Sequence, residues 1–184
     1  MGPIWAASHV AAGHDVESAV VALDGVRRHL LLRGDAEDEL RRSLEGLPQA
    51  AARKRASVAW EASTSLSESA GETLARVRMI RLGFEPPELQ LVVTADGHRF
   101  RPDYAWRSLA LLGEFDGQGK YAGNEGAVRR AEKEREEALR RAGFRVFRLS
   151  WADISNPHAL RKALSANGVP PAVRDERGNV RRFR

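Results

Sequence analysis

The stretch from Leu109 to Asp116 constrains the fold of this 184-residue chain more than any other feature. It is apolar on both faces until its end, which is typical of a central strand that is covered on both sides. Because side chains alternate along a strand, Glu114 and Asp116 at its end should point to the same face. Segments with helical spacing lie before and after it, so the sequence predicts an α/β fold with a sheet flanked by helices.

A hairpin is predicted ahead of this strand. The segment Leu89 to Ala95 is apolar and β-branched, and Asp96-Gly97 is a two-residue turn that hairpins prefer. The return strand should run from His98 to about Tyr104. With a loop of this length, Gln90 lies opposite Asp103.

The other predicted elements follow from helical periodicity, caps and breakers. Small polar residues at 61–69 indicate a linker, which places a boundary near residue 65. Further elements are expected as helices at 15–33, 35–47, 49–61, 70–82, 124–142 and 156–168 and as a strand at 146–149. The predicted organisation is a flexible N-terminus (1–14), a helical segment (15–65), an α/β domain (66–168) and a basic disordered tail (169–184).

Composition restricts the classes of function. The chain has no cysteine, which excludes disulfides and thiolate zinc sites and agrees with a reducing cytoplasm. Its formal net charge of +5 favours a polyanionic partner such as DNA. No apolar run approaches the ~20 residues that a membrane helix needs, and the N-terminus lacks a secretory pattern. A cytoplasmic protein that does not enter a membrane is therefore expected.

Asp103 and Glu114 are the candidate metal ligands. The hairpin and the central strand should bring these two carboxylates together, where their repulsion is relieved by a divalent cation such as Mg²⁺ or Mn²⁺. Such a cation orients a water molecule and polarises a phosphodiester oxygen, which is the chemistry of a nuclease. The alternative is a pair of surface acids at strand ends.

Asp116 and Lys120 are less easily assigned. Nucleases of the type D…(D/E)-x-K usually have a catalytic lysine two residues after the second acid, and here Asp116 occupies that position. Lys120 can supply the ammonium from a glycine-rich loop, or it can be a solvated loop residue. Asp116 can act as a third ligand or can cap the turn before Gly117.

Glu72 and Arg135 are further candidates. Glu72 starts a helix, where it either contributes to the site or forms a capping box with Ser69. Arg135 lies within the apolar stripe of its helix, and a buried guanidinium needs an acidic partner. A link to Asp116 or Glu72 is the preferred interpretation, and a surface pair with Glu132 at i, i+3 is the alternative.

Several of these segments together resemble the Vsr-like endonuclease-fold domains found in the C-terminal part of actinobacterial AbiEi-like proteins. The resemblance implies a restriction-endonuclease-like, PD-(D/E)XK-type mixed sheet flanked by helices, with a metal held by Asp103 and Glu114. It also implies contributions to the site from Glu72 and Arg135. Relatives commonly carry histidine at the position of Lys120. The segments that carry the resemblance are 67–72, 101–106, 114–117, 132–143 and 148–153.

Two classes of function follow. The first is a Mg²⁺-dependent DNA endonuclease or nickase that hydrolyses phosphodiester bonds, and the acid pair of Asp103 and Glu114 favours it. The second is a nuclease fold that does not cleave, in an antitoxin or repressor that binds DNA, a partner protein or a second copy of itself. The absence of a lysine two residues after Glu114 favours this alternative.

Overall fold

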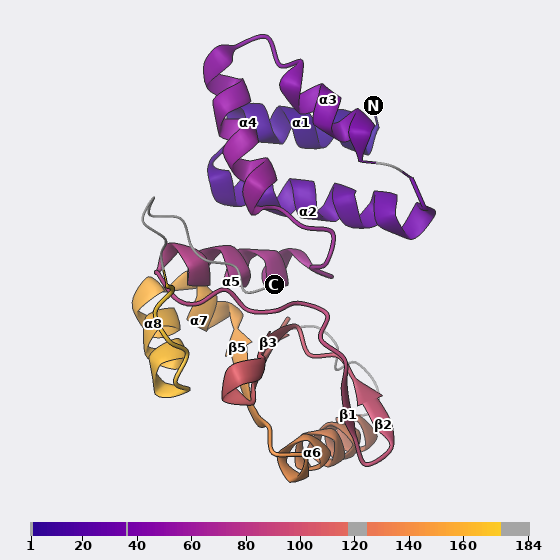
Figure 1. Cartoon of the computed structure of the whole chain (residues 1–184), viewed down its shortest axis with the longest axis vertical. Helices are drawn as coiled ribbons and strands as arrows, with labels where there is room; N and C mark the ends of the chain where they lie inside the picture. Colours follow the sequence, from indigo (N-terminus) through magenta and orange to yellow (C-terminus); the bar gives the residue numbers. More distant parts are fainter. Residues whose placement is uncertain (1, 36, 118–124, 174–184) are drawn as a thin grey trace. The chain divides into compact units, whose positions relative to one another are not determined.

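A computed structural model of the chain describes residues 2–35, 37–117 and 125–173, without the side chains of 125–129. It shows a mixed α/β protein with helices and small sheets (Figure 1). The chain forms two compact units, Met1–Val77 and Arg78–Arg184. The division falls within helix α5 (Ala70–Arg81) and not at the predicted boundary near 65, because the side chain of Val77 belongs to the core of the first unit.

The first unit is helical, and its first helix was not predicted. Residues 1–14 were expected to be flexible, but Pro3 starts helix α1, and Ala7 and Ala11 are buried in the core. These small side chains give a weak periodic pattern in the sequence, although they allow close packing of helices. The helices of this unit ahead of α5 are α1 (Pro3–Gly13), α2 (Val16–Arg33), α3 (Asp38–Glu45) and α4 (Ala50–Ala62).

Helix α2 begins and ends where the sequence predicts. Asp15 is the N-cap and accepts a hydrogen bond from the Ser18 backbone N–H at 3.0 Å. Gly34 ends the helix in the left-handed conformation, with φ of 71°, which glycine adopts without strain. The next helix was expected at 35–47, but it starts at Asp38 with Glu37 as its N-cap.

A buried ion pair holds the segment that was predicted to be a linker. Asp24 on α2 pairs with Arg76 on α5 at 2.9 Å, and their side chains are 2% and 7% exposed. The same carboxylate accepts hydrogen bonds from the Thr73 hydroxyl at 2.8 Å and the Thr64 backbone N–H at 2.7 Å. Residues 63–69 are indeed non-helical, but Thr64 within them is fixed by this buried acid.

The second unit contains a hairpin and a three-stranded sheet. In the sheet the strand order is β3-β4-β5, with β3 antiparallel and β5 parallel to the central strand β4. The predicted hairpin and central strand are therefore confirmed. The elements are β1 (Val93–Ala95), β2 (His98–Phe100), β3 (Tyr104–Trp106), β4 (Leu111–Asp116), α6 (Glu125–Arg141) and β5 (Arg145–Ser150).

The hairpin has the predicted register but is shorter than predicted. Val93 pairs with Phe100, and an isolated bridge between Glu88 and Ala105 follows the same register farther along. Gln90 and Asp103 lie between these two paired positions and belong to neither strand, and Gln90 has a φ of 59°. The expected return strand to Tyr104 is thus divided into β2 and β3 by the Arg101-Pro102-Asp103 segment.

Both faces of the sheet are covered, as the apolar run predicts. Ala105, Leu112 and Val146 lie side by side in the strand register and form an apolar row. Ala138 and Leu139 of α6 belong to the same hydrophobic cluster, and Figure 1 shows this helix beside the hairpin. The residues of the other face include Tyr104, Gly113 and Phe147.

The C-terminal part contains two helices and a short return segment. Helix α7 (Trp151–Ser155) starts with a capping box of Ser150 and Asp153, and α8 (Pro157–Ala166) starts at the N-cap Asn156, as predicted. Residues 170–172 were expected to be disordered, but the backbone of 83–85 pairs with them through two hydrogen bonds of 2.8 Å. The remainder of the predicted tail, 174–184, lies outside the described residues.

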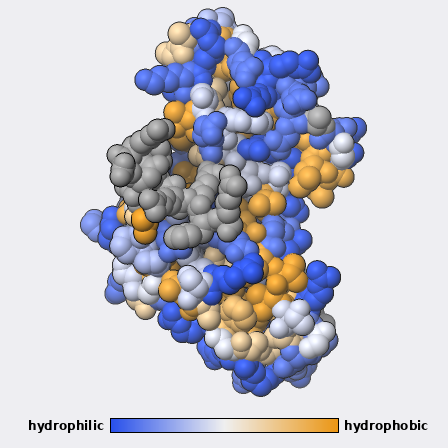
Figure 2. All heavy atoms as spheres, in the orientation of Figure 1, coloured by the Kyte–Doolittle hydropathy of each residue, from blue (hydrophilic) through white to orange (hydrophobic). Residues whose placement is uncertain are grey.

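The surface is mainly hydrophilic on the face drawn in Figure 2, and apolar patches interrupt it. Large apolar side chains that are exposed include Leu31 and Leu32 near the end of α2, and Trp151. Within the described ranges, no helix combines the length and the apolar character that crossing a bilayer requires.

Candidate functional site

The candidate site is a row of charged residues across the three-stranded sheet. Tyr104 pairs with Gly113 at the end of the β3–β4 ladder, and Asp103 precedes Tyr104 just outside β3, on the side of Glu114. On its other side Glu114 pairs with Arg148 in the parallel register. Residues that are directly opposite in a sheet point to the same face. Glu114 and Arg148 therefore point to the face of the apolar row, and together with the adjacent Asp103 they are called the charged row.

Asp103 is anchored to the strand that carries the second acid. Its Oδ2 accepts a hydrogen bond from the Phe115 backbone N–H at 2.7 Å. The preceding Pro102 is buried and cannot donate a backbone hydrogen bond, which suits the break between the two strands. The Asp103 carboxylate is consequently held next to the backbone of Glu114.

Glu114 is more enclosed than the two arginines that it contacts. Its side chain is 13% exposed, and its Oε1 forms an ion pair with Nη2 of Arg135. Nη2 of Arg148 lies 3.7 Å from Oε2, and Nη1 of Arg148 lies 3.7 Å from Oε1 of Glu132. Arg135 was expected to pair with Asp116 or Glu72, and within its own unit the acid that it contacts is Glu114 and not Asp116.

Helix geometry explains why Arg135 reaches Glu114. Arg135 lies three and four residues before Ala138 and Leu139, so it continues their stripe one turn toward the charged row. Its guanidinium carbon is 5.8 Å from the centre of the Phe100 ring, a distance at which a cation–π attraction is favourable. At the end of the apolar stripe, the Arg135 guanidinium therefore contacts the half-buried Glu114 carboxylate.

Asp116 and Lys120 remain without an assigned role. Asp116 is half-buried, lies on the same face as Glu114 and pairs with Ser150 in the parallel register. No described contact brings it to Asp103, so its role as a third ligand stays a prediction. Lys120 lies outside the described residues, and its proposed catalytic contribution is likewise untested.

Glu72 makes one half of the capping box that one interpretation predicts, the bond from its backbone N–H to Ser69, and its carboxylate binds the Glu68 N–H in place of the Ser69 N–H. Its carboxylate accepts hydrogen bonds from the Glu68 backbone N–H and the Ser69 hydroxyl, both at 2.7 Å. The Ser69 hydroxyl oxygen accepts the Glu72 backbone N–H at 3.2 Å. Glu72 belongs to the first compact unit, whereas the charged row belongs to the second. Its contribution to the site therefore stays a prediction from the resemblance.

The donor atoms of the charged row suit a divalent cation. Mg²⁺ prefers oxygen ligands and is commonly held by one or two carboxylates, with water and substrate oxygens completing its shell. Asp103 and Glu114 can provide two such carboxylates. Arg135 already contacts one Glu114 oxygen, so it competes with a cation for that position. Among the described residues, no group of three or more histidines or acids could hold a metal ion.

Arg148 and Glu132 are members of the site that the sequence interpretation missed. A strand was predicted at 146–149, but its register against β4 was not. The two strands are parallel and joined through helix α6, so no short turn defines their alignment. If Leu112 of β4 is aligned with Val146 of β5 as an apolar pair, Arg148 lies beside Glu114.

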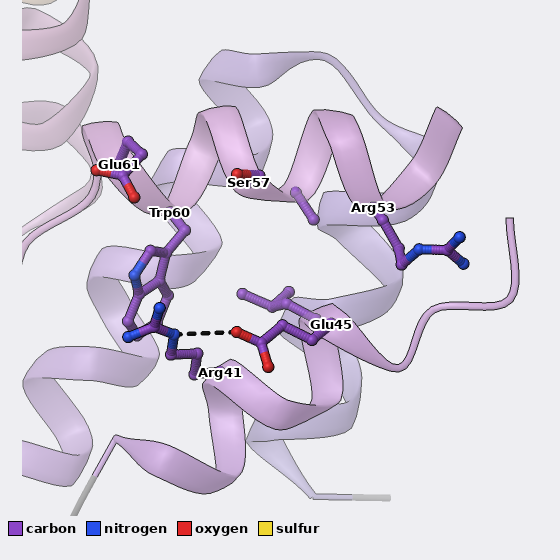
Figure 3. A pocket seen from close by; sticks show the side chains of 8 residues that line it. Arg41, Glu45, Arg53, Ser57, Trp60 and Glu61 are labelled. Carbon is purple, nitrogen blue, oxygen red and sulfur yellow. Dashed lines mark hydrogen bonds and ion pairs between the residues drawn. The ribbon is translucent and has the colours of Figure 1, made fainter. Parts of the chain in front are cut away.

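A pocket of about 240 Å³ lies elsewhere, between α3 and α4 in the first unit. Figure 3 shows that Trp60 and the exposed ion pair of Arg41 and Glu45 contribute to its walls. None of the candidate site residues lines it. Its lining consists of Arg41, Leu44, Glu45, Arg53, Ala56, Ser57, Trp60 and Glu61.

The positive charge of the chain is concentrated in the unit that carries the charged row. Residues 1–77 contain 9 of the 30 Lys and Arg and 11 of the 25 Asp and Glu, whereas residues 78–184 contain 21 and 14. Comparisons of the chain with protein-family models, curated proteins and solved structures found no match. The resemblance to Vsr-like domains therefore rests on the sequence motifs alone.

Proposed function

We propose that this protein is a metal-dependent DNA endonuclease or nickase with a restriction-endonuclease-like core. The observation that carries the proposal is the hydrogen bond from the Phe115 backbone N–H to Asp103 Oδ2 at 2.7 Å, which holds this carboxylate beside the strand that carries Glu114. The succession of α5, hairpin, β3, β4, α6 and β5 is also the order expected of a PD-(D/E)XK-type core. The basic character of the second unit suits a polyanionic substrate.

The three residues of the charged row have roles in this proposal, and so do Arg135 and Lys120. Asp103 and Glu114 hold Mg²⁺ or Mn²⁺, which supplies Lewis-acid polarisation and an activated water when bound. Arg135 and Arg148 offer guanidinium groups that bind phosphate oxygens and stabilise their charge. Lys120, four residues after Asp116, is proposed as a further charge stabiliser. DNA as the partner and the cytoplasm as the location are parts of the same proposal.

A second function is favoured by a different observation. Glu114 is already neutralised by two guanidiniums, and Asp116 stands where nucleases of this type have lysine. Such a site suits a protein that binds DNA without cleaving it, as in an antitoxin or repressor. We rank this function second because the Asp103 carboxylate is still held beside the strand that carries Glu114.

Supercoiled plasmid distinguishes the two functions. With Mg²⁺ or Mn²⁺ the wild-type protein should nick or cut the plasmid, and Glu114→Gln should reduce the rate by about 100-fold or more. The matched control is Glu136→Gln, because Glu136 pairs with Arg140 on the surface of α6 and should leave cleavage unchanged. A salt-dependent gel shift without cleavage supports the second function, and a protein that neither cuts nor shifts DNA contradicts both.

A further inference from the structure

We propose that Arg135 keeps the metal site closed in the free protein and that a nucleic-acid phosphate opens it by drawing this guanidinium away from Glu114. Nucleic acid and metal would then bind cooperatively. The inference rests on the proposed function, but it concerns a separate property, the exchange of partners within the charged row.

The closed state follows from the contacts of Glu114. Arg135 contacts Oε1, Arg148 lies 3.7 Å from Oε2, and only 13% of the carboxylate side chain is exposed. A divalent cation that binds this carboxylate needs one of the same oxygens. It would also experience repulsion from a guanidinium at that oxygen, since like charges at short range destabilise each other. The affinity of the free protein for metal should consequently be low.

The guanidiniums of Arg135 and Arg148 are both exposed enough to move away from Glu114 toward a ligand in solution. The Arg135 side chain is 33% exposed, and its other described contact is the Phe100 ring at 5.8 Å. The Arg148 side chain is 34% exposed and has a second acid, Glu132, at 3.7 Å. Solvent reaches both, and so can a phosphate.

A phosphodiester is the ligand that fits these two cations. Guanidinium binds phosphate oxygens in a bidentate manner, with charge-assisted hydrogen bonds. When a phosphate binds Arg135, Glu114 loses the closer of its two guanidiniums, and a largely enclosed carboxylate that keeps only Arg148 at 3.7 Å favours a new cation. Metal and nucleic acid therefore each increase the affinity for the other, by the same factor.

Metal binding tests the closed state without any measurement of cleavage. Mn²⁺ is titrated by calorimetry into the full-length protein in the absence of DNA. Arg135→Gln should bind Mn²⁺ roughly 10-fold more tightly than the wild type, a typical size for coupling between sites. Arg140→Gln is the matched control, because it removes the same charge from the same helix but pairs with Glu136. Adding Glu114→Gln to Arg135→Gln should abolish the gain.

The coupling is tested through DNA binding. The anisotropy of a labelled phosphorothioate duplex, which resists cleavage, measures DNA affinity with and without Mn²⁺. Mn²⁺ should raise the DNA affinity of the wild type roughly 10-fold and should have a much smaller effect on Arg135→Gln. If circular dichroism shows that Arg135→Gln does not fold, Arg148→Gln replaces it and should show a smaller gain in Mn²⁺ affinity.

Mn²⁺ binding and plasmid cleavage together distinguish an error in the closure by Arg135 from an error in the proposed nuclease function. If the free wild-type protein binds Mn²⁺ as tightly as Arg135→Gln, closure by Arg135 is wrong, and plasmid cleavage can still establish the nuclease. If neither protein binds Mn²⁺ while plasmid is still cut, closure is wrong as well. If neither binds Mn²⁺ and no plasmid is cut, the proposed nuclease function is itself overturned.

Discussion

At the scale of single residues, Gly113 determines how closely the central strand packs beside Glu114. A Cβ at this position would lie 3.0 Å from Cζ of Phe147 and 3.2 Å from Cδ2 of Tyr104. Gly113→Ala should therefore lower the free energy of unfolding by about 1–3 kcal/mol, which is typical of overpacking. Urea denaturation followed by circular dichroism measures this change.

Gly25 provides the matched control for that substitution. It lies inside helix α2, and a Cβ there meets no heavy atom within 4 Å. Gly25→Ala should stabilise the protein by roughly 0.8–1 kcal/mol, because alanine is the better helix former. If Gly113→Ala is as stable as the wild type, the strand does not pack tightly against the two rings.

At the scale of elements, the start of helix α2 should depend on pH. The Ser18 backbone N–H, followed by its hydroxyl, lowers the pKa of Asp15 below its ordinary value of 3.8. The folded state therefore binds a proton at this carboxylate less readily than the unfolded state does. The contribution of the cap should be complete above the ordinary pKa and should be lost as the pH falls through the lowered one.

Two substitutions test this assignment of the cap. Carbon-detected NMR titration should show a pKa for Asp15 below the ordinary value. In Ser18→Ala the pKa of Asp15 should rise only part of the way to its ordinary value. The variant loses the hydroxyl, but it keeps the backbone N–H, which is the larger cause of the lowered pKa. In Asp15→Asn, urea denaturation should show a smaller loss of stability on acidification. An Asp15 pKa at its ordinary value in the wild type would contradict the cap.

At the scale of the whole molecule, charge is distributed unevenly along the chain. The excess of Lys and Arg lies in residues 78–184, so DNA should bind there by an electrostatic, salt-dependent contact. Each phosphate contact contributes about 0.9 to the slope of log affinity against log salt concentration. Arg148→Gln should therefore reduce that slope by about one unit. Anisotropy of a labelled duplex at several salt concentrations measures it.

Arg41 in the first unit is the matched control for this measurement. It is exposed and pairs with Glu45 at 3.1 Å, so Arg41→Gln removes the same charge from residues that carry no positive excess. It should leave the salt slope unchanged. Equal slopes for Arg148→Gln and Arg41→Gln would show that the charged row does not contact phosphates.

Several elements could be predicted because their signals lie in neighbouring residues. Asp15 and Gly34 mark the ends of α2, and the Asp96-Gly97 turn determines the register of the hairpin. The apolar run before Glu114 similarly identifies the central strand. The sequence also predicts that the hairpin and the central strand bring Asp103 close to Glu114, and the hydrogen bond from the Phe115 N–H to Asp103 agrees with this expectation.

Only the tertiary structure decided which cations surround the acids. The sequence by itself determined that Glu114 lies near the end of the central strand, that Asp103 follows the hairpin, and that Arg135 continues an apolar stripe. Arg148 reaches Glu114 through a parallel pairing, and Arg135 reaches it through the packing of α6 on the sheet. Both contacts depend on long-range packing and not on a local turn. A buried ion pair likewise forms where packing brings the two charges together, so periodicity predicts the need for a partner but not its identity.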